Sequence, residues 1–334
     1  MPELTLLDAL PEAFFSLSGP RELGRILPNP TLIHLQGQRA DTLFVSTLLH
    51  GNEDSGFYAL QQLLQTYRHR PLPRRLSLFF GNIDAAQAGM RHLPHQPDYN
   101  RIWPGHRLGD KPETRMAARV VAELEPRDLF ASIDIHNNTG DNPFYSCISQ
   151  HDATTLQLAA LFSPITLMYG TVQGVQSIAM ARYCPAMTIE CGKPGVSDDV
   201  GRIVRFLEQV LELPDWNTPQ PERPLAIYRT AVRVMVPGQV SCSFSDPVAD
   251  LCFPSDLEQM NFRLQPAGTV FAHLQPGSGA RLLAFDDAGH ELGDRYFLHT
   301  SDKLVLSQAM TPAMLTHDET VIRQDCLCYL LERL

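Results

Sequence analysis

Short apolar segments rich in β-branched residues alternate with longer amphipathic segments between residue 31 and about residue 213. This alternation is typical of an α/β sheet covered by helices. The apolar segments predict strands at 31–35, 42–49, 75–80, 129–135 and 186–189. The segments whose apolar residues recur at helical spacing predict helices at 55–67, 112–124, 154–162 and 198–213.

A polar segment rich in proline, residues 214–224, interrupts this pattern and reads as a linker, because clustered prolines stop a helix. Beyond it lie short strand-like segments separated by Gly, Pro and Asp turns, at 227–236, 268–274, 281–285 and 303–307. We therefore expect an α/β catalytic domain over residues 1–218, with a mostly parallel mixed sheet flanked by helices. A smaller all-β domain is expected over residues 219–334.

The composition excludes several classes of protein. The formal net charge is −10, with 27 basic and 37 acidic residues and no Lys/Arg-rich run, so nucleic acid is not an expected partner. No segment approaches the roughly 18 consecutive apolar residues of a membrane span, and the N-terminus lacks a basic signal region. Seven scattered cysteines without a Cys-x-x-Cys pair do not indicate disulfides or a thiolate zinc site. We expect a cytoplasmic protein without a membrane partner; a homo-oligomer is compatible with the sequence.

Polar residues directly follow the apolar segment 42–49, where the sequence is His50-Gly51-Asn52-Glu53. In open α/β sheets ligands bind beyond the carboxyl ends of strands, so His50 and Glu53 emerge where a site is expected. Zinc accepts imidazole nitrogen and carboxylate oxygen, and a tight turn brings both to one ion. Alone the pair is weak evidence, because a His at a strand end is more often a hydrogen-bonded loop residue.

The segment 129–135 also ends in polar residues and supplies His136 as a third metal ligand. Two nitrogens, one carboxylate and an open position form the usual catalytic zinc set, so we expect one Zn²⁺ per chain. Asp134 lies two residues before His136 and so faces the same side of the strand. It either orients the ligand His136 or caps a backbone amide, and both interpretations stay open.

Two further segments carry candidate residues. A long polar loop after the segment 75–80 contains Arg91, Asn100 and Arg101; Arg binds carboxylates with two hydrogen bonds and stabilises an oxyanion. The alternative is a solvated loop held by ion pairs. The segment 186–189 delivers Glu190 into a Gly/Pro-rich loop, where a carboxylate can act as general base toward water. Its neighbour Cys191 lacks a partner His at a recognisable spacing and is interpreted as a packing residue.

Taken in order, these motifs resemble the succinylglutamate desuccinylase and aspartoacylase family, relatives of the zinc carboxypeptidases. The sequence His50-Gly51-Asn52-Glu53 is similar to the first metal motif of that family. The segment 134–139, Asp-Ile-His-Asn-Asn-Thr, resembles the aspartoacylase form of the second motif, and the segment 189–193, Ile-Glu-Cys-Gly-Lys, resembles the desuccinylase form of the motif that carries the base.

The resemblance implies a zinc-carboxypeptidase-like fold with a C-terminal β domain, and zinc-dependent cleavage of the amide bond of a small N-acyl amino acid. It also implies that Arg91 polarises the scissile carbonyl and that Asn100 and Arg101 bind a substrate carboxylate. The expected partner is therefore a small molecule that carries a carboxylate. A metallocarboxypeptidase acting on peptides is one alternative. A non-catalytic zinc-binding protein is another, although Glu190 argues against it because a structural zinc site needs no base.

Overall fold

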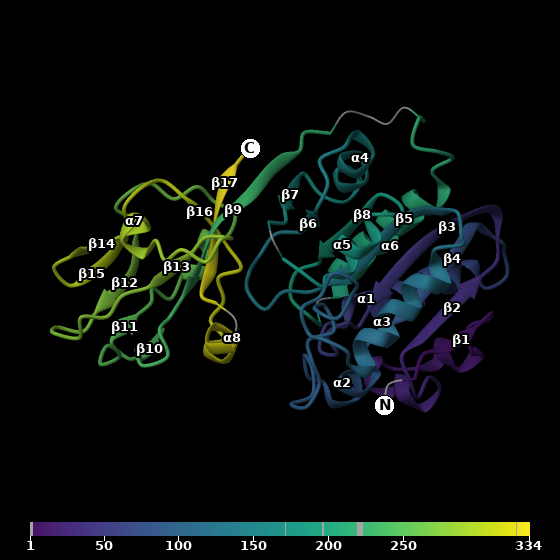
Figure 1. The fold of residues 1–334 in the computed structure, drawn as a ribbon, viewed down its shortest axis with the longest axis horizontal. Coiled ribbons are helices and arrows are strands. Elements are labelled where there is room, and N and C mark those ends of the chain that lie inside the picture. Colours follow the sequence, from purple (N-terminus) through teal and green to yellow (C-terminus); the bar gives the residue numbers. More distant parts are fainter. Residues whose placement is uncertain (1–2, 171, 196, 219–222, 325) are drawn as a thin grey trace. The chain divides into compact units, whose positions relative to one another are not determined.

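The structure is a computed structural model that describes residues 3–170, 172–195, 197–218, 223–324 and 326–334. The chain forms two compact units (Figure 1). Unit 1 consists of Met1–Asn137 and Phe144–Leu225, and unit 2 consists of Asn138–Pro143 and Ala226–Leu334. Residues 219–222 of the expected linker lie outside the described residues, so the boundary expected at residue 218 stays a prediction.

The sheet of unit 1 is mixed and has the strand order β1-β2-β4-β3-β5-β8-β6-β7. Its central strands β4, β3, β5 and β8 are parallel neighbours, whereas β2 pairs with β4 and β6 pairs with β8 in antiparallel fashion. The strands are β1 (Thr5–Leu7), β2 (Thr31–Leu35), β3 (Gly37–Thr47), β4 (Leu72–Phe80), β5 (Leu129–His136), β6 (Tyr145–Ile148), β7 (Ile165–Met168) and β8 (Ala186–Glu190). The expected fold class is confirmed.

Helices cover both faces of this sheet because its buried strands are apolar on both sides. Along β3, Leu43 and Val45 pack in one apolar cluster with residues of α1 (Ser55–Tyr67), α4 (Ala153–Phe162) and α6 (Ser197–Glu212). Phe44 points to the opposite face and packs with α3 (Pro112–Leu124) and α5 (Gln176–Met180). The remaining elements of unit 1 are the short helix α2 (Ile83–Ala88) and the 3₁₀ helices η1 (Glu12–Ser16) and η2 (Pro20–Arg25). The four long helices expected from the sequence are all present.

A fully buried arginine fastens the end of α6 to the sheet. Arg74 on β4 is 0% exposed; its Nε donates to the carbonyl oxygen of Leu211 at 3.2 Å, and its Nη2 donates to that of Leu213. Its Nη1 lies 3.0 Å from a carboxylate oxygen of Asp41, and the guanidinium lies 3.2 Å from the centre of the Phe130 ring. The carbonyl groups at a helix C-terminus lack partners within the helix, and Arg74 supplies donors to two of them; the carbonyl oxygen of Leu211 also accepts from Arg39 Nη2.

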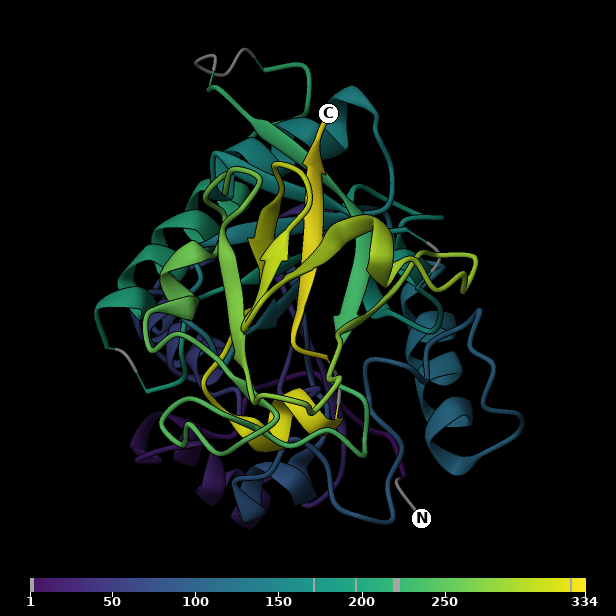
Figure 2. The ribbon, with the colours of Figure 1, turned by 90° about the vertical axis from the view of Figure 1, so that its left-hand side faces the viewer.

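Unit 2 is built mainly from strands (Figure 2). It has its own apolar core. One set of antiparallel strands has the order β13-β9-β17-β16, and a five-stranded sheet has the order β10-β11-β12-β15-β14. Its elements are β9 (Ala226–Met235), β10 (Cys242–Ser243), β11 (Leu251–Cys252), η3 (Leu257–Met260), β12 (Val270–Leu274), β13 (Leu283–Phe285), α7 (Gly293–Tyr296), β14 (Phe297–Thr300), β15 (Lys303–Leu306), β16 (Thr311–Ala313), α8 (Glu319–Gln324) and β17 (Cys328–Arg333). Among the described residues, every helix is too short or too polar to span a bilayer.

The role of Arg74 leads to a stability prediction. Replacing Arg74 with Met removes the cation that contacts the carbonyl group of Leu213 and the carboxylate of Asp41, while the carbonyl group of Leu211 keeps its bond from Arg39. We expect the free energy of unfolding to fall by about 3 kcal/mol, measured by urea denaturation followed by circular dichroism. The control is Arg75→Met, an exposed position on the same strand, which should change stability by less than about 0.5 kcal/mol. Equal stability of the two variants would contradict a role of Arg74 in holding the end of α6 to the sheet.

Candidate functional site

The parallel pairing of β3, β5 and β8 brings the polar strand ends together. Ser46 pairs with Asp134 in the register of β3 and β5, and His136 pairs with Glu190 in the register of β5 and β8. Because the carboxyl ends of parallel strands meet at one edge of a sheet, residues from widely separated motifs become neighbours. The sequence motifs at residues 50, 136 and 190 therefore emerge at the same edge.

A tight turn after β3 positions His50. Leu48 adopts φ of 56°, which ends the extended strand, and the backbone N–H of Gly51 donates to the carbonyl oxygen of Arg91 at 3.0 Å. A side chain at Gly51 would place its Cβ 2.2 Å from the backbone of Ala85, so the turn accepts only glycine. The glycine of the His-Gly-x-Glu motif thus lets this turn pack closely against the segment that leads to Arg91.

His50, Glu53 and His136 form a buried cluster around one point. Each can offer one ligand atom, and these atoms all lie within 4.8 Å of one another. The two oxygens of Glu53 lie 2.7 Å from His50 Nδ1 and 2.7 Å from His136 Nδ1, and the two Nδ1 atoms are 3.2 Å apart. Two imidazole nitrogens and a carboxylate form a donor set that fits zinc, and the described residues offer this one group.

The electrostatics of the cluster favour a charged carboxylate. Burial raises the pKa of the Glu53 carboxyl, but the adjacent His50 and His136 outweigh it and hold that pKa well below its usual range. Burial lowers the pKa of the His136 imidazole, but Asp134 and Glu53 outweigh it and raise that pKa well above its usual value. Opposite charges at short distance in a buried site account for both directions.

Asp134 holds His136 in place. It is 0% exposed; one carboxylate oxygen accepts from Ser46 Oγ at 2.6 Å, and the other lies 2.8 Å from His136 Nε2. With Nε2 engaged by Asp134, Nδ1 of His136 is the atom turned toward Glu53. Of the two interpretations of Asp134, the structure supports the one in which it orients a candidate ligand.

Asn137 connects this cluster to the loop that follows Glu190. Its backbone N–H donates to Glu53 at 3.1 Å, and its side-chain Nδ2 donates to the carbonyl oxygens of Cys191 at 3.2 Å and Gly192 at 3.0 Å. Gly192 has φ of 68°, a conformation that favours glycine, so the chain can turn directly after the base candidate. Glu190 itself is 8% exposed and ends β8 beside His136.

The loop residues expected to bind substrate lie around Asp98, a residue that the sequence analysis did not select. Asp98 lies 3.0 Å from His50 Nε2, accepts from Arg91 Nη2 at 2.9 Å, and accepts from the backbone N–H of Asn100 at 2.7 Å. Burial raises the pKa of the Asp98 carboxyl, but the bond and charge of His50 and the nearby charges of Arg91 and Arg101 outweigh it and lower that pKa. Asp98 stands two residues before Asn100, and no local sequence pattern marks it as a site residue.

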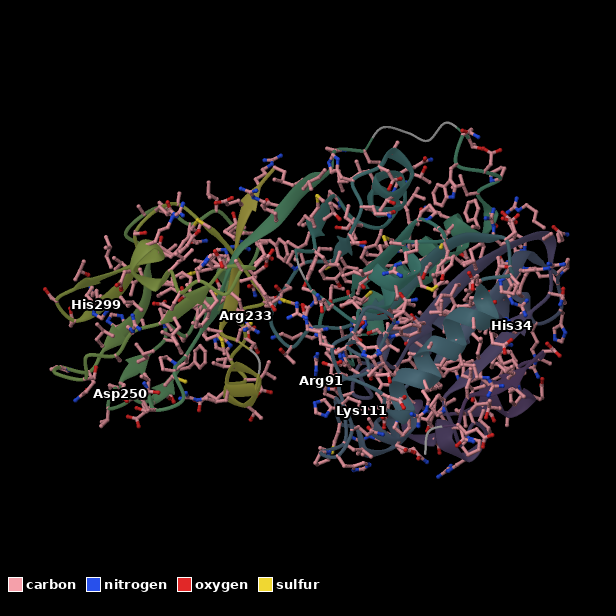
Figure 3. All side chains as sticks on the ribbon, viewed as in Figure 1. His34, Arg91, Lys111, Arg233, Asp250 and His299 are labelled. Atoms are coloured by element: carbon pink, nitrogen blue, oxygen red, sulfur yellow. The ribbon has the colours of Figure 1, made fainter. Side chains whose placement is uncertain are left out.

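Arg91, Asn100 and Arg101 differ in how they are held. The Arg91 side chain, which is labelled in Figure 3, is 44% exposed, and its Nη1 lies 3.8 Å from a carboxylate oxygen of Glu53. Asn100 is buried; its Nδ2 lies 3.3 Å from His136 Nε2, and its Oδ1 accepts from the backbone N–H of Gln176. Arg101 Nη1 donates to the carbonyl oxygen of Asn100 at 2.7 Å. Their roles toward a substrate stay predictions.

Comparison with known proteins identifies the matching family. Residues 39–212 match the model of the succinylglutamate desuccinylase/aspartoacylase catalytic domain. Similar solved structures include the succinylglutamate desuccinylase from Chromobacterium violaceum, with 19% identity, a TM-score of 0.56, and coverage of 88% of this chain and 85% of that chain. A comparison with curated proteins gave no match.

Two further solved structures resemble this chain. The succinylglutamate desuccinylase/aspartoacylase from Rhodobacter sphaeroides has 16% identity and a TM-score of 0.60, covering 90% of this chain and 88% of that chain. Murine aminoacylase 3 has 17% identity and a TM-score of 0.60, covering 89% of this chain and 96% of that chain. At these identities the structural matches support the fold alone.

The contact between Asp134 and His136 leads to a prediction about metal affinity. Asp134→Asn weakens the acceptor at His136 Nε2, so the imidazole becomes a poorer and less well oriented ligand. We expect the affinity for added Zn²⁺ to fall by about 10- to 100-fold, measured by competition with a chromogenic chelator. Asp128→Asn, at an exposed position just before β5, is the matched control. An unchanged zinc affinity in Asp134→Asn would refute the orienting role.

Proposed function

Because this chain belongs to the succinylglutamate desuccinylase/aspartoacylase family, we propose that it is a zinc-dependent hydrolase that cleaves the amide bond of a small N-acyl amino acid. The products are a carboxylic acid and a free amino acid. The observation that carries the proposal is the register of β5 and β8, which places Glu190 next to His136 at the edge where the three candidate metal ligands converge.

His50, Glu53 and His136 would hold the zinc ion. Zinc at such a set of donors acts as a Lewis acid toward a carbonyl group and lowers the pKa of water toward neutrality. The protein supports this set with two carboxylates, since Asp134 engages Nε2 of His136 and Asp98 engages Nε2 of His50. Both imidazoles are thereby held with Nδ1 directed at Glu53.

Glu190 is the proposed general base. A carboxylate at the end of β8 can take a proton from the attacking water and then pass it to the nitrogen of the leaving amine. The carbonyl oxygen becomes negative as water attacks, and the guanidinium of Arg91, at the border of the cluster, is the proposed charge that stabilises it. This part of the proposal rests on the place of Glu190 beside His136 and on the closeness of Arg91 to Glu53.

A substrate carboxylate is proposed to bind at Arg101 and Asn100. A guanidinium offers two parallel N–H groups that match the two oxygens of a carboxylate, which makes arginine the usual residue for this recognition. Asn100 is fixed between His136 and the start of α5, so a substrate held there would lie near the metal-binding group. This arrangement favours a small substrate whose carboxylate is close to its amide bond.

Metal content and substrate preference test the proposal together. We expect the wild-type protein to carry about one zinc per chain and to release amine from N-acetyl or N-succinyl amino acids. His50→Ala should lose the metal, whereas His69→Ala, an exposed control, should retain it. Hydrolysis of short peptides only would replace the proposal with a carboxypeptidase. A protein that neither binds nor needs a metal would end it.

The role of Glu190 has a separate test. Glu190→Gln keeps the size of the side chain but removes the proton acceptor, so we expect kcat to fall by about two orders of magnitude or more. Zinc content should stay near the wild-type value, because Glu190 is not a proposed ligand. Glu125→Gln, at an exposed position, is the control. Wild-type kcat in Glu190→Gln would remove Glu190 from the mechanism.

A further inference from the structure

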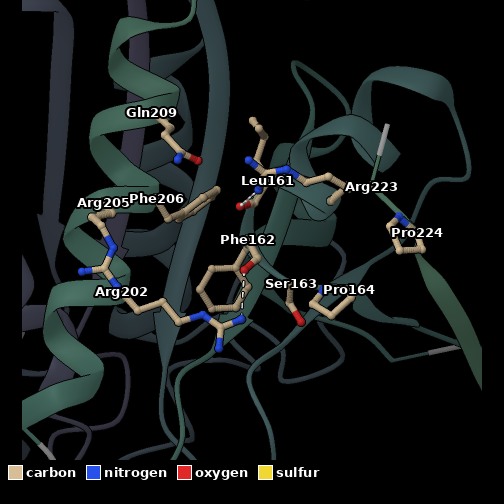
Figure 4. Close-up of a pocket in the computed structure, with 11 residues that line it drawn as sticks. Leu161, Phe162, Ser163, Pro164, Arg202, Arg205, Phe206, Gln209, Arg223 and Pro224 are labelled. Atoms are coloured by element: carbon tan, nitrogen blue, oxygen red, sulfur yellow. Dashed lines mark hydrogen bonds between the residues drawn. The ribbon is translucent and has the colours of Figure 1, made fainter. Parts of the chain in front are cut away.

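A pocket lies in unit 1, and it shares no lining residue with the candidate active site. Its volume is about 400 Å³, within the range of pockets that hold small organic molecules. Residues of α4, of α6 and of the segment that follows α4 form its walls, together with Arg223 and Pro224 (Figure 4). None of these lining residues belongs to the group proposed to bind zinc or substrate.

The pocket is positively charged. Arg202, Arg205 and Arg223 line it, and among the described residues no acidic side chain does. This concentration is notable in a chain whose formal net charge is −10. Burial lowers the pKa of Arg202 and the nearby cation Arg205 adds to that effect, while Asp199 acts in the opposite direction. Cations held close together gain stability from an anion placed between them.

The arginines retain donors for a ligand. A guanidinium carries five N–H groups in a fixed plane. Arg202 Nη2 donates to the carbonyl oxygen of Phe162 at 3.3 Å, and Arg223 Nη1 donates to that of Leu161 at 3.2 Å. Among the residues that the structure describes, Arg205 is in no ion pair. These two backbone contacts position Arg202 and Arg223 while leaving most of their donors available.

The remaining walls are apolar. Leu161 and Phe162 on α4 and Phe206 on α6 line the pocket together with Pro164 and Pro224. In Figure 4 the rings of Phe162 and Phe206 lie between the arginines of α6 and Arg223. A ligand that combines an anionic group with a flat or branched apolar body matches both the charge and the walls. Inorganic ions would leave the apolar walls in contact with water.

We propose that this pocket binds a small organic anion whose carboxylate or phosphate group contacts Arg202 and Arg205 and whose apolar body packs against Phe162 and Phe206. Arg202 also connects the pocket to the loop that follows Glu190. Its guanidinium lies 4.3 Å from the centre of the Phe144 ring, and a Cβ placed on Gly192 would lie 3.7 Å from that ring. An anion that draws Arg202 toward it therefore acts on the packing of this loop.

Binding is tested by isothermal titration calorimetry on the zinc-loaded protein, with benzoate and phenylphosphate as probes and benzyl alcohol as a neutral comparison. We expect Arg205→Ala to weaken binding of at least one anion by about tenfold or more. Arg119→Ala removes the same charge from an exposed position on α3 and should bind as the wild type does. The stronger probe identifies the preferred anionic group.

The active site also attracts anions, so a second variant separates the two sites. Anion binding that persists in Arg101→Ala belongs to the pocket if it is lost in the double variant that also carries Arg205→Ala. Equal affinity of Arg205→Ala and the wild type, or no saturable binding of either anion, would overturn the pocket as a site. These outcomes do not depend on hydrolysis, and so they are independent of the proposed function.

The link to the loop is tested by hydrogen–deuterium exchange of the peptide that contains Cys191 and Gly192. We expect the bound probe to slow or speed exchange there by a factor of two or more in the wild type and in Arg119→Ala, but not in Arg205→Ala. If the probe binds but the exchange rate of this peptide does not change, the pocket is an anion site without a connection to the loop.

Discussion

The parallel register of β3, β5 and β8 is the constraint on which the candidate site depends. It aligns Ser46 with Asp134 and His136 with Glu190, so one sheet edge receives side chains from three motifs that are far apart in the sequence. Side chains alternate between the two faces of a strand, and a shift of one residue would turn His136 away from Glu53. The apolar residues that cover both faces of β3 fix this register, because the same shift would exchange their positions between two different cores.

The second constraint is the burial of charge. Glu53 and Asp134 are almost inaccessible to solvent, and a buried carboxylate is stable only when its oxygens are paired. Each oxygen of Glu53 faces a different imidazole, while Asp134 divides its oxygens between Ser46 and His136. Such a network resists rearrangement, because moving one member would leave another buried group unpaired at a cost in free energy. The same bonds that make the buried charges tolerable also aim the two Nδ1 atoms at one point, which a metal site requires.

The sequence predicts elements best where the pattern is strongly periodic, and Thr31–Leu35, Ser55–Tyr67 and Pro112–Leu124 have the bounds expected. It predicts the candidate ligands because they directly follow apolar strands. It misses the first part of β3, whose alternation of polar residues gives no apolar run, and it extends that strand past Thr47, where the positive φ of Leu48 ends it. It also misses Asp98, because the contact with His50 spans 48 residues and depends on the path of a loop that no local pattern specifies.

The contrast between Arg91 and Arg205 shows why net charge is a poor guide to anion binding in this chain. Arg91 lies 2.9 Å from Asp98, so a substrate must compete with a carboxylate that is already present. One oxygen of Asp98 faces His50 and the other accepts from Arg91, so the two partners share this carboxylate. Arg205 has no such competitor among the residues that the structure describes, yet its pocket contains no metal-binding group to activate water. Affinity for an anion and chemistry on it are therefore separable in this protein: the first needs only guanidinium groups and apolar walls, whereas the second needs the buried imidazole and carboxylate groups that the parallel strands bring together.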